Sequence, residues 1–383
     1  MKVLHFGKFP ARHFGGIETH VKGLTEGLAR AGVEVTNLVY DAGRTIGGVV
    51  ESEVNGVRIV AVPCRGTVAS LAIAPSTPGT VARLSRARRF DLAHAHFPDP
   101  LAFACLPFAA GAARIASWHS DIVRQRRLGR LYGAAARLLF DPLDAVAGAT
   151  PSHLDSRQLA AFRPRRRYVV PYGTDLARFA PTPAIDAAAA RLRTEVGDRP
   201  IVFALGRHVY YKGFEVLLDA MRSVDAVLLL GGSGPLTEAL RQRAGDLVAR
   251  GTVRFVGRID DADLPAYYHA ATVYALPSLA QSEAFGLVQL EAMSCGTPIV
   301  NCDLGNAVNF VAPSHVCAVT VPPGDAAALA SALRRLLDDP ALGRRLGLAG
   351  ALRAKERFSM DAMIDATLTM YRDVLATSAG RPR

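Results

Sequence analysis

Two glutamates eight residues apart, Glu283 and Glu291, mark the chemically most informative segment of this sequence. An apolar run ends just before them near Leu276, and a helix is predicted to open about nine residues after it. The first backbone amides of a helix have no partner within the helix, so they bind anions at the carboxyl edge of a parallel sheet. The amides concerned would be those of Phe285, Gly286 and Leu287.

The spacing of the two carboxylates separates them by about two helical turns. They could therefore hold opposite ends of one elongated ligand, with phosphates at the helix start and hydroxyl groups facing Glu283 and Glu291. A nucleotide sugar fits that description. The alternative is an ordinary acidic first turn, in which Glu283 only complements the helix dipole.

A second group of polar residues follows the predicted strand 201–205. Gly206 allows a close turn, Arg207 can clamp oxygens through two hydrogen bonds, and Lys212 adds a second positive charge at the same edge. Together these cations could neutralise a diphosphate. The alternative is a solvated loop that carries two surface cations.

The first half of the chain has its own candidate residues. Gly15–Glu18 forms a glycine loop between the first strand and the first helix, but it is not the G-x-G-x-x-G fingerprint of a dinucleotide site. His119 ends a predicted strand, where it could be catalytic, position substrate or be structural. His94 and His96 alternate on one strand, and we favour a structural role for both. No His, Cys or Asp cluster has metal-ligand spacing in the sequence.

Short β-branched runs alternate with helical patterns through both halves, which is typical of parallel sheets covered by helices. The sequence therefore predicts an α/β fold of two Rossmann-like, doubly wound domains that face a central cleft. A segment rich in Pro and Gly, 171–183, reads as the linker between them. Strands are predicted at 3–7, 35–40, 58–62, 92–96, 114–118, 145–149, 201–205, 226–230, 253–256, 273–276 and 298–301, and helices at 17–31, near 214, 236, 264 and 285, and at 360–375.

Composition limits the class of protein. The chain has 383 residues, half of them hydrophobic, and a net charge of +11, which favours anionic partners. Its five cysteines show no C-x-x-C spacing, so neither a disulfide framework nor a structural zinc site is expected, and the cytosol is the natural compartment. The longest apolar stretch, 101–113, is too short for a membrane span. No pattern specifies an oligomeric state.

Positive charge is concentrated between Arg114 and Arg178, a segment that contains 12 arginines and 5 aspartates. One interpretation is a basic protein that binds nucleic acid, but the segment lacks interleaved aromatic residues and any known nucleic-acid module, so we expect no nucleic-acid partner. The part from Arg126 to Phe140 mixes cationic and apolar residues like a helix at an anionic membrane surface. A solvated helix face is the remaining alternative.

Four motifs in order along the chain resemble the retaining glycosyltransferases of family 4, which have the GT-B architecture. They are the E-x7-E pair Glu283–Glu291, the G-R-x4-K-G loop 206–213, the G-G-I-E turn 15–18 and the interdomain P-x-G-x-D stretch 171–175. The segment 118–125, W-H-S-D-I-V-R-Q, further resembles a subgroup that assembles bacterial O-antigen, capsule and exopolysaccharide. One departure is the segment 304–309, L-G-N-A-V-N, where the family pattern would have a G-T-G-T-like turn.

The resemblance implies a role for each matching residue. Arg207 and Lys212 would bind the donor diphosphate, Glu291 would bind the ribose hydroxyls, and Glu283 would bind the transferred sugar. His119 would lie on the other side of that sugar. The donor-binding set implied by the resemblance also contains Gly16, Arg258, Phe285, Gly286 and Leu287.

The resemblance also implies domains and an activity. Residues 1–172 would bind the acceptor, 173–359 would bind the nucleotide sugar, and the helix and tail 360–383 would pack back on the first domain. The enzyme would transfer a hexose from a UDP- or GDP-sugar, with retention and without a metal, to a saccharide or lipid-linked acceptor of a cell-surface polysaccharide. It would be cytoplasmic, with peripheral attachment to the inner face of the membrane as an option. Alternatives are a small soluble acceptor, a nucleotide-sugar epimerase and a sugar phosphate transferase.

Overall fold

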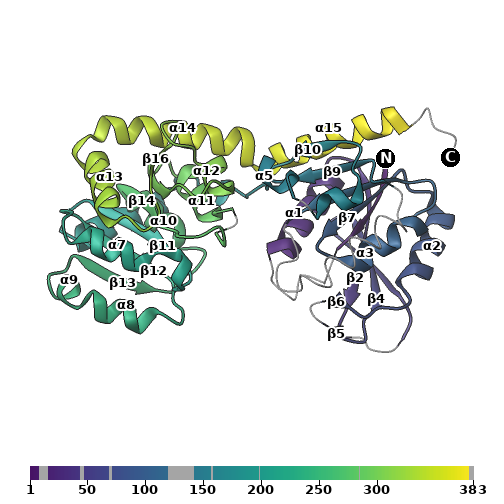
Figure 1. Ribbon diagram of the computed structural model, residues 1–383, viewed down its shortest axis with the longest axis horizontal. Helices are drawn as coiled ribbons and strands as arrows, with labels where there is room; N and C mark the ends of the chain where they lie inside the picture. The colour runs from purple at the N-terminus through teal and green to yellow at the C-terminus, as the bar shows by residue number, and fades with distance from the viewer. Residues whose placement is uncertain are drawn as a thin grey trace. The chain divides into compact units, whose positions relative to one another are not determined.

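A computed structural model of the chain describes residues 1–7, 16–43, 47–68, 71–119, 142–156, 158–197, 199–283 and 285–378. The chain divides into two compact units (Figure 1). Unit 1 comprises Met1–Gly173 together with Met360–Arg383, and unit 2 comprises Thr174–Ser359. The sequence-based boundaries after residues 172 and 359 lie within one residue of these divisions.

Unit 1 is built on a sheet of eight strands in its described part, in the order β10-β9-β8-β7-β1-β2-β4-β3. All neighbouring strands are parallel except the edge pair β3 and β4. A small antiparallel pair, β5 (Thr67–Val68) and β6 (Leu71–Ala72), lies apart from it. The strands of the large sheet are β1 (Lys2–Phe6), β2 (Glu34–Asp41), β3 (Val50–Val54), β4 (Val57–Pro63), β7 (Leu92–Phe97), β8 (Ala113–Trp118), β9 (Ala145–Gly148) and β10 (Arg167–Val169).

Helices cover both faces of this sheet because its strands are apolar on both sides. Leu4 and Phe6 of β1 pack in one core with Trp118, whereas Val3 packs in a second core on the opposite face. Helices α1 (Gly16–Arg30) and α15 (Met360–Ser378) contribute to that second core. The C-terminal helix therefore packs on the N-terminal unit, as predicted. The other helical segments are α2 (Thr77–Arg88), α3 (Pro100–Cys105), α5 (Pro151–Leu154), η1 (Leu106–Phe108) and η2 (Leu159–Phe162).

Unit 2 contains a fully parallel sheet of six strands in its described part, in the order β13-β12-β11-β14-β15-β16. Its strands are β11 (Ile201–Leu205), β12 (Val227–Gly231), β13 (Val253–Gly257), β14 (Val273–Leu276), β15 (Ile299–Cys302) and β16 (Ala318–Val321). Its helices are α6 (Pro183–Glu195), α7 (Phe214–Met221), α8 (Thr237–Arg243), α9 (Gly245–Ala249), α10 (Leu264–Ala270), α11 (Leu287–Ser294), α12 (Ala307–Val311), α13 (Ala326–Asp338) and α14 (Pro340–Phe358), with short turns η3 (Ala177–Phe179) and η4 (Tyr210–Lys212).

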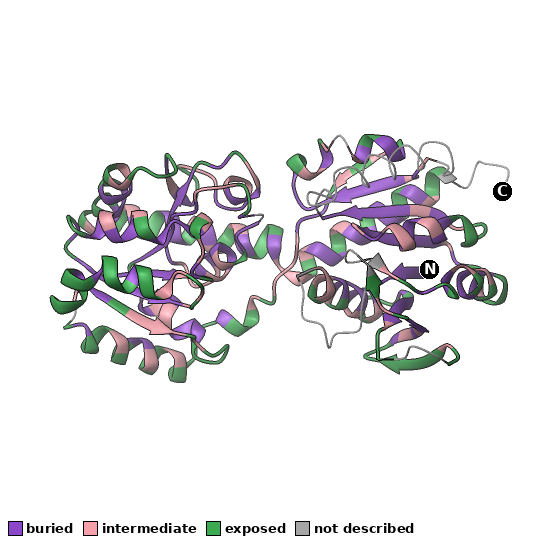
Figure 2. Cartoon of the chain, turned by 60° about the horizontal axis from the view of Figure 1, so that its bottom comes forward, coloured by how far each residue is buried: buried purple, intermediate pink, exposed green. Residues whose placement is uncertain are grey.

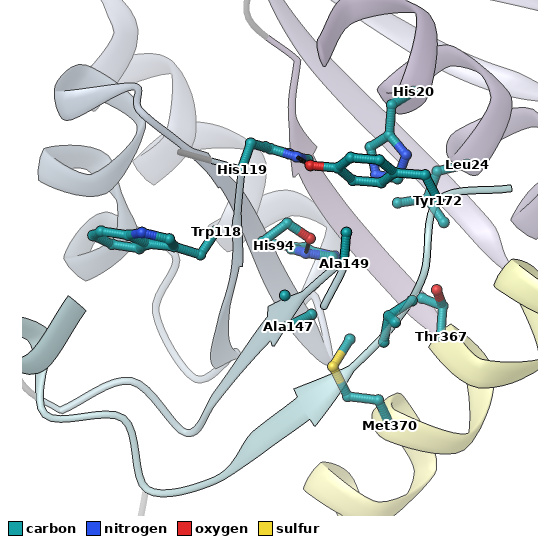
Figure 3. A pocket seen from close by; sticks show the side chains of 13 residues that line it. His20, Leu24, His94, Trp118, His119, Ala147, Ala149, Tyr172, Thr367 and Met370 are labelled. Carbon is teal, nitrogen blue, oxygen red and sulfur yellow. Dashed lines mark hydrogen bonds between the residues drawn. The ribbon is translucent and has the colours of Figure 1, made fainter. Parts of the chain in front are cut away.

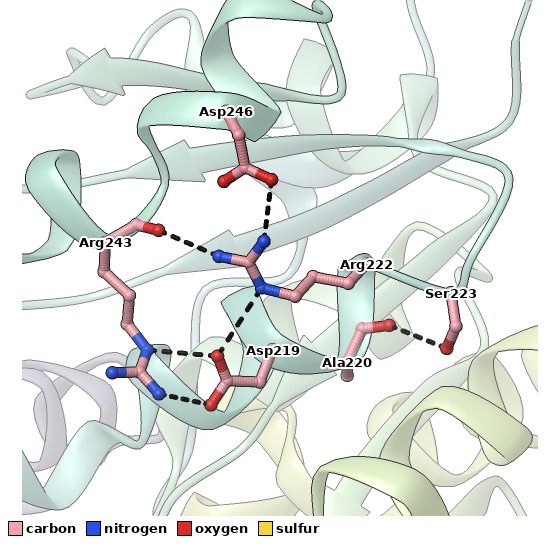
Figure 4. A network of polar contacts seen from close by, with 6 residues as sticks. All are labelled: Asp219, Ala220, Arg222, Ser223, Arg243 and Asp246. Atoms are coloured by element: carbon pink, nitrogen blue, oxygen red, sulfur yellow. Dashed lines mark hydrogen bonds and ion pairs between the residues drawn. The ribbon is translucent and has the colours of Figure 1, made fainter.

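Burial follows the layers of both units, with buried strands inside and helices exposed on their outer faces (Figure 2). On the outer surface of unit 2, helices α7, α8 and α9 are joined by a cluster of ion pairs (Figure 4). Arg243 Nη2 lies 2.5 Å from Asp219 Oδ2, and Arg222 Nη1 lies 2.7 Å from Asp246 Oδ2. Such exposed pairs contribute little stability individually, so the buried strands hold the unit together.

Candidate active site

The order of strands in unit 2 creates a switch point between β11 and β14. From β11 the chain continues towards β12 on one side, and from β14 it continues towards β15 on the other. Ligands of open α/β sheets bind outside the carboxyl ends of the strands at such a point. The loop 206–213 follows β11 and the segment 277–286 follows β14, so the sheet brings the two predicted motifs of this half together.

Lys212 and Glu283 form a buried ion pair at this switch point. The ammonium Nζ lies 2.5 Å from Glu283 Oε2, and each side chain is only about a tenth exposed. Ser278 Oγ donates a hydrogen bond to the same carboxylate oxygen at 3.1 Å. Charge-assisted bonds of this kind are strong and directional, so each charge fixes the position of the other.

Glycines allow the two loops to approach closely enough for this pair to form. Gly213 has φ +68°, and a Cβ there would lie 2.0 Å from the carbonyl oxygen of Pro277. A Cβ on Gly206 would lie 3.2 Å from Lys212 Cε, so the lysine chain runs across that glycine. Leu279 N donates to Tyr211 O at 2.7 Å, which joins the two loops through their backbones. Only glycine satisfies both the conformation and the space at position 213.

Arg207 and Arg258 lie at the same edge of the sheet, after β11 and β13. Both are exposed, and neither guanidinium bonds to any residue in the described part of the chain. Backbone hydrogen bonds join their loops in series, because Gly206 N donates to Gly231 O and Gly232 N donates to Gly257 O. The edge therefore presents two unpaired cations beside the buried Lys212–Glu283 pair.

Glu291 lies in α11 and is held by two partners that the sequence analysis missed. Tyr268 donates its hydroxyl to Glu291 Oε2 at 2.7 Å, and Arg178 Nη2 lies 3.2 Å from Oε1. The Arg178 guanidinium also lies 4.5 Å from the ring centre of Phe179. Burial raises the pKa of Glu291, although both partners oppose that shift. No sequence spacing connects these residues with Glu291.

The start of α11 differs from the prediction. The helix begins at Leu287, with Gly286 as its N-cap at φ +69°, rather than at Phe285. Phe285 is buried, with its ring 6.2 Å from that of Phe358, so it is a core residue and not a first-turn residue. The left-handed turn at Gly286 delays the helix, and Gln289 Nε2 occupies the space where a Cβ would lie. The amides of Gly286 and Leu287 still donate to no residue that the structure describes.

The turn that departs from the family pattern supports Glu283 through the backbone. Asn306 Nδ2 donates to Glu283 O at 2.9 Å, while its Oδ1 caps α12 by accepting from Val308 N. Asn309 Oδ1 accepts from the amides of Leu304 and Gly305, which fixes the shape of the turn. The side chain of Asn306 is therefore a positioning group that the sequence analysis did not identify.

In unit 1 the candidate His119 follows β8 and is buried. Its Nδ1 is hydrogen-bonded to the Tyr172 hydroxyl at 2.6 Å, and its Nε2 is hydrogen-bonded to His96 Nδ1 at 3.0 Å. The ring of His20 in α1 packs edge-on against the His119 ring, with 5.1 Å between the two ring centres (Figure 3). Gly16 is the first residue of α1, and the loop before it, residues 8–15, lies outside the described residues.

The histidines of unit 1 form a buried cluster. Burial lowers the pKa of His5 to about 3 and that of His20 to about 4. It also lowers the pKa values of His94, His96 and His119 well below the usual range, so these rings are neutral at pH 7.

Two sets of three rings have nitrogens within 4.8 Å of one another and could hold a metal ion. These sets are His5, His94 and His96, and His20, His96 and His119. The sequence spacing did not reveal these two sets, because their histidines come from β1, α1, β7 and the end of β8, which are far apart along the chain.

Two other expectations concern regions that the structure covers only in part. Residues 120–141, which include five of the 12 arginines between 114 and 178 and the whole of the segment 126–140, lie outside the described residues, as does the tail 379–383. None of the helices in the described ranges is both long and apolar enough to cross a bilayer.

Comparisons with known proteins agree with this geometry. The model of group 1 glycosyl transferases matches residues 190–353, and that of glycosyltransferase family 4 matches residues 14–178. O-antigen chain mannosyltransferase C of Escherichia coli is 28% identical over 99% of this chain and 100% of its own length. A phosphatidyl-myo-inositol mannosyltransferase of Mycolicibacterium smegmatis is 32% identical over 90% of this chain and 85% of its own.

Solved structures show the same architecture. Sucrose-phosphate synthase of Thermosynechococcus elongatus matches with a TM-score of 0.70 at 26% identity, over 98% of this chain and 99% of that chain. HepE of Anabaena in complex with UDP matches with a TM-score of 0.74 at 18% identity, over 97% of this chain and 100% of that chain.

Two Rossmann-like units define a GT-B fold, and the family matches make the chain a glycosyltransferase that uses a nucleotide sugar. The chain belongs to the family 4, or group 1, glycosyltransferases.

Proposed function

We propose that this glycosyltransferase moves a hexose, with mannose from GDP-mannose as the first candidate, to a saccharide or lipid-linked acceptor of a bacterial cell-surface polysaccharide. The names of its relatives support this choice. They include an O-antigen chain mannosyltransferase, phosphatidyl-myo-inositol mannosyltransferases and a GDP-mannose-dependent mannosyltransferase that acts on a phosphatidylinositol monomannoside. In this proposal unit 2 binds the donor and unit 1 binds the acceptor.

The buried Lys212–Glu283 pair is the observation that supports the donor site most directly. An ammonium has three donors, so Lys212 can keep its bond to Glu283 and still donate to a phosphate oxygen. Arg207 and Arg258 would meet the remaining phosphate oxygens, because both are exposed at the same edge. The Gly286 and Leu287 amides would bind the β-phosphate, Glu283 a sugar hydroxyl, and Glu291 the ribose hydroxyls.

The proposed chemistry is transfer with retention, by departure of the nucleoside diphosphate from the face that the acceptor attacks. Negative charge grows on the leaving phosphate in the transition state. Lys212, held in place by Glu283, and Arg207 stabilise that charge, which is the part that a metal ion plays in other transferases. The proposal therefore needs no metal. His119 and the loop before Gly16 belong to the acceptor side.

We also propose that the enzyme works in the cytoplasm and visits the inner membrane surface to reach a lipid-linked acceptor. The excess of 12 arginines over 5 aspartates between residues 114 and 178 supports this. Cations near an anionic surface contribute up to about 1 kcal/mol each and are screened by salt. The chain should co-sediment with phosphatidylglycerol vesicles at low salt and not with neutral vesicles. Binding that ignores lipid charge would contradict the proposal.

Calorimetric titration with GDP, UDP and a short oligonucleotide tests the donor site. Nucleoside diphosphate should bind and the oligonucleotide should not. Replacing Lys212 or Arg207 by Ala removes a charge-assisted bond that contributes about 1.5–3 kcal/mol, so affinity or turnover should fall about 10- to 150-fold. Arg250→Ala is the matched control, because Arg250 is exposed in unit 2 at the end of α9.

Incubation with GDP-mannose and UDP-glucose, followed by NMR of the product, then identifies the donor and the anomeric configuration. A product with the donor's α configuration supports retention, and a β product contradicts it. Binding of the oligonucleotide in place of the nucleoside diphosphates would replace the whole proposal by a nucleic-acid function.

A further inference from the structure

A continuous chain of hydrogen bonds runs through unit 1, behind His119. It begins at Ser117 on β8 and passes through two histidines of β7, one of β1 and a tyrosine of α15. The successive contacts are Ser117 Oγ to His94 Nε2 (2.9 Å), His94 Nδ1 to Tyr371 OH (2.6 Å), Tyr371 OH to His5 Nε2 (3.0 Å), His5 Nδ1 to His96 Nε2 (3.3 Å), His96 Nδ1 to His119 Nε2 (3.0 Å) and His119 Nδ1 to Tyr172 OH (2.6 Å).

The two-residue period of the strands explains why these side chains meet. Leu92 of β7 and Ile115 of β8 pack in the core beneath α1 and α15, so the residues at even positions of β7 and odd positions of β8 point to that face. His5, His94 and Tyr371 have almost no exposed surface. The rings stay neutral because burial disfavours their charged form.

Neutral imidazoles in such a chain cannot choose their tautomers independently. Each neutral ring donates through one nitrogen and accepts through the other. Nδ1 of His5 faces Nε2 of His96, and Nδ1 of His96 faces Nε2 of His119. If one ring carries its proton on Nδ1, the next ring must accept on Nε2 and carry its own proton on Nδ1. The three rings therefore share one tautomer.

We propose that His5, His96 and Tyr371 are positioning residues for His119, which they hold in one orientation and in one tautomer shared by all three histidines. Tyr371 extends this coupling to the C-terminal helix, because its hydroxyl joins His5 to His94. The kinetic consequence rests on the proposed function, in which His119 lies on the acceptor side of the transferred sugar. The tautomer consequence does not.

NMR of the full chain with ¹⁵N-labelled histidine tests the shared tautomer directly. Long-range correlations distinguish protonated from unprotonated ring nitrogens, and single histidine variants assign the signals. His5, His96 and His119 should all carry the proton on Nδ1, or all on Nε2. A mixture of the two tautomers among these three rings would overturn the proposal.

Tyr371→Phe tests the coupling, because it removes one hydroxyl and leaves the ring that fills the core. Tyr168→Phe is the matched control. The Tyr168 hydroxyl donates to Asp373, which lies in α15 like Tyr371, and it makes none of the hydrogen bonds that link the histidines. The His119 nitrogen signals should move in Tyr371→Phe and stay in Tyr168→Phe. A change in melting temperature without any change in those signals would show that Tyr371 is merely structural.

Kinetics supply the second readout. Loss of one neutral hydrogen bond corresponds to an effect of about 2- to 12-fold, so Tyr371→Phe should lower turnover by about that factor and leave the affinity for GDP unchanged. Equal activity of the two tyrosine variants would overturn the positioning role. A wild-type enzyme without transferase activity would refute the proposed function, while the NMR result would still decide the coupling.

Titration with Zn²⁺ tests the competing use of the same rings. Stoichiometric binding that shifts the signals of His20, His96 and His119 together would identify a metal site, because a metal ion would replace the shared protons. That outcome would overturn the hydrogen-bonded chain. Signals that do not respond to Zn²⁺ support it.

Discussion

Mild acid should unfold unit 1 selectively, because its buried histidines cannot take up protons until the unit opens. Folding lowers the pKa of His5 to about 3, that of His20 to about 4, and those of His94, His96 and His119 well below 6.5. In the unfolded chain each titrates near 6.5. Between 6.5 and the folded values the unfolded state therefore binds more protons, so stability is complete above about pH 7 and falls as the pH drops below 6.5.

The size of the effect follows from linkage. For a histidine that stays neutral in the folded unit, lowering the pH to about 5 costs about 2 kcal/mol of stability. Five such rings would cost the unit up to about 10 kcal/mol, which is comparable with the whole stability of an ordinary domain. In unit 2 one histidine of the described part, His208, has a pKa lowered by burial, so unit 2 should lose much less.

Tryptophan fluorescence can follow unit 1 alone. The sequence contains one Trp, and Trp118 is buried in unit 1 with its ring stacked on Phe97 at a centroid distance of 3.7 Å. Urea unfolding would be monitored by this fluorescence between about pH 8 and pH 5. Far-UV circular dichroism would report both units in the same samples. Each titrating histidine adds up to about 1.4 kcal/mol per pH unit to the slope of unfolding free energy against pH.

Two variants make the test specific. His94→Asn removes one buried imidazole. It should lower the slope of unfolding free energy against pH by up to about 1.4 kcal/mol per pH unit, which corresponds to one proton. His315→Asn is the control, because His315 is exposed in unit 2 and has φ +62°, a conformation that asparagine tolerates. The reasoning would be refuted if the stability reported by Trp118 changed by less than about 1.4 kcal/mol between pH 7 and pH 5.

Three further predictions concern unit 2. Gly213→Ala should destabilise this unit by about 1–3 kcal/mol, since it combines φ +68° with a clash against Pro277 O, and chemical unfolding followed by circular dichroism measures the loss. Glu291→Gln should weaken binding of nucleoside diphosphate, and Glu283→Gln should mainly lower turnover; unchanged kinetics in both, with the fold intact, would contradict their roles. Because burial raises the pKa of Glu291, this carboxylate takes up a proton at a higher pH than an ordinary glutamate does. As the pH is lowered, affinity for the nucleotide should therefore begin to fall at that higher pH, and Glu291→Gln should flatten the dependence in a calorimetric pH series.

Most of the parallel strands were predictable because burial on both faces makes each one a continuous apolar run, although the parallel edge strand β16 was missed. The predicted strand 201–205 matches β11, and 273–276 matches β14. Strand β3 was missed because it is an exposed antiparallel edge whose polar alternation, V-E-S-E-V, has no apolar core signal. Strand β10 was missed because its three residues are too few to form a pattern.

The candidate site was only partly predictable. Lys212 and Glu283 were each identified from local motifs. Their ion pair depends on β11 lying beside β14, and local sequence patterns do not determine the order of strands in a sheet. The partners of Glu291 were missed for the same reason, because Arg178 and Tyr268 come from distant segments. The helix start at Leu287 was placed two residues early because glycine at 286 can be helical or left-handed, and only packing decides.

Helix α15 gives unit 1 an unusual order of assembly during synthesis. The first 173 residues of unit 1 leave the ribosome long before Met360–Ser378, and all of unit 2 is made in between. Until α15 arrives, the face of α1 around Gly27, where Ile364 packs closely, is open to water. Domains usually fold from the N-terminus onward as they emerge. In this chain unit 2 can finish first, and the nascent unit 1 must keep an uncovered apolar face from aggregating until translation is nearly complete.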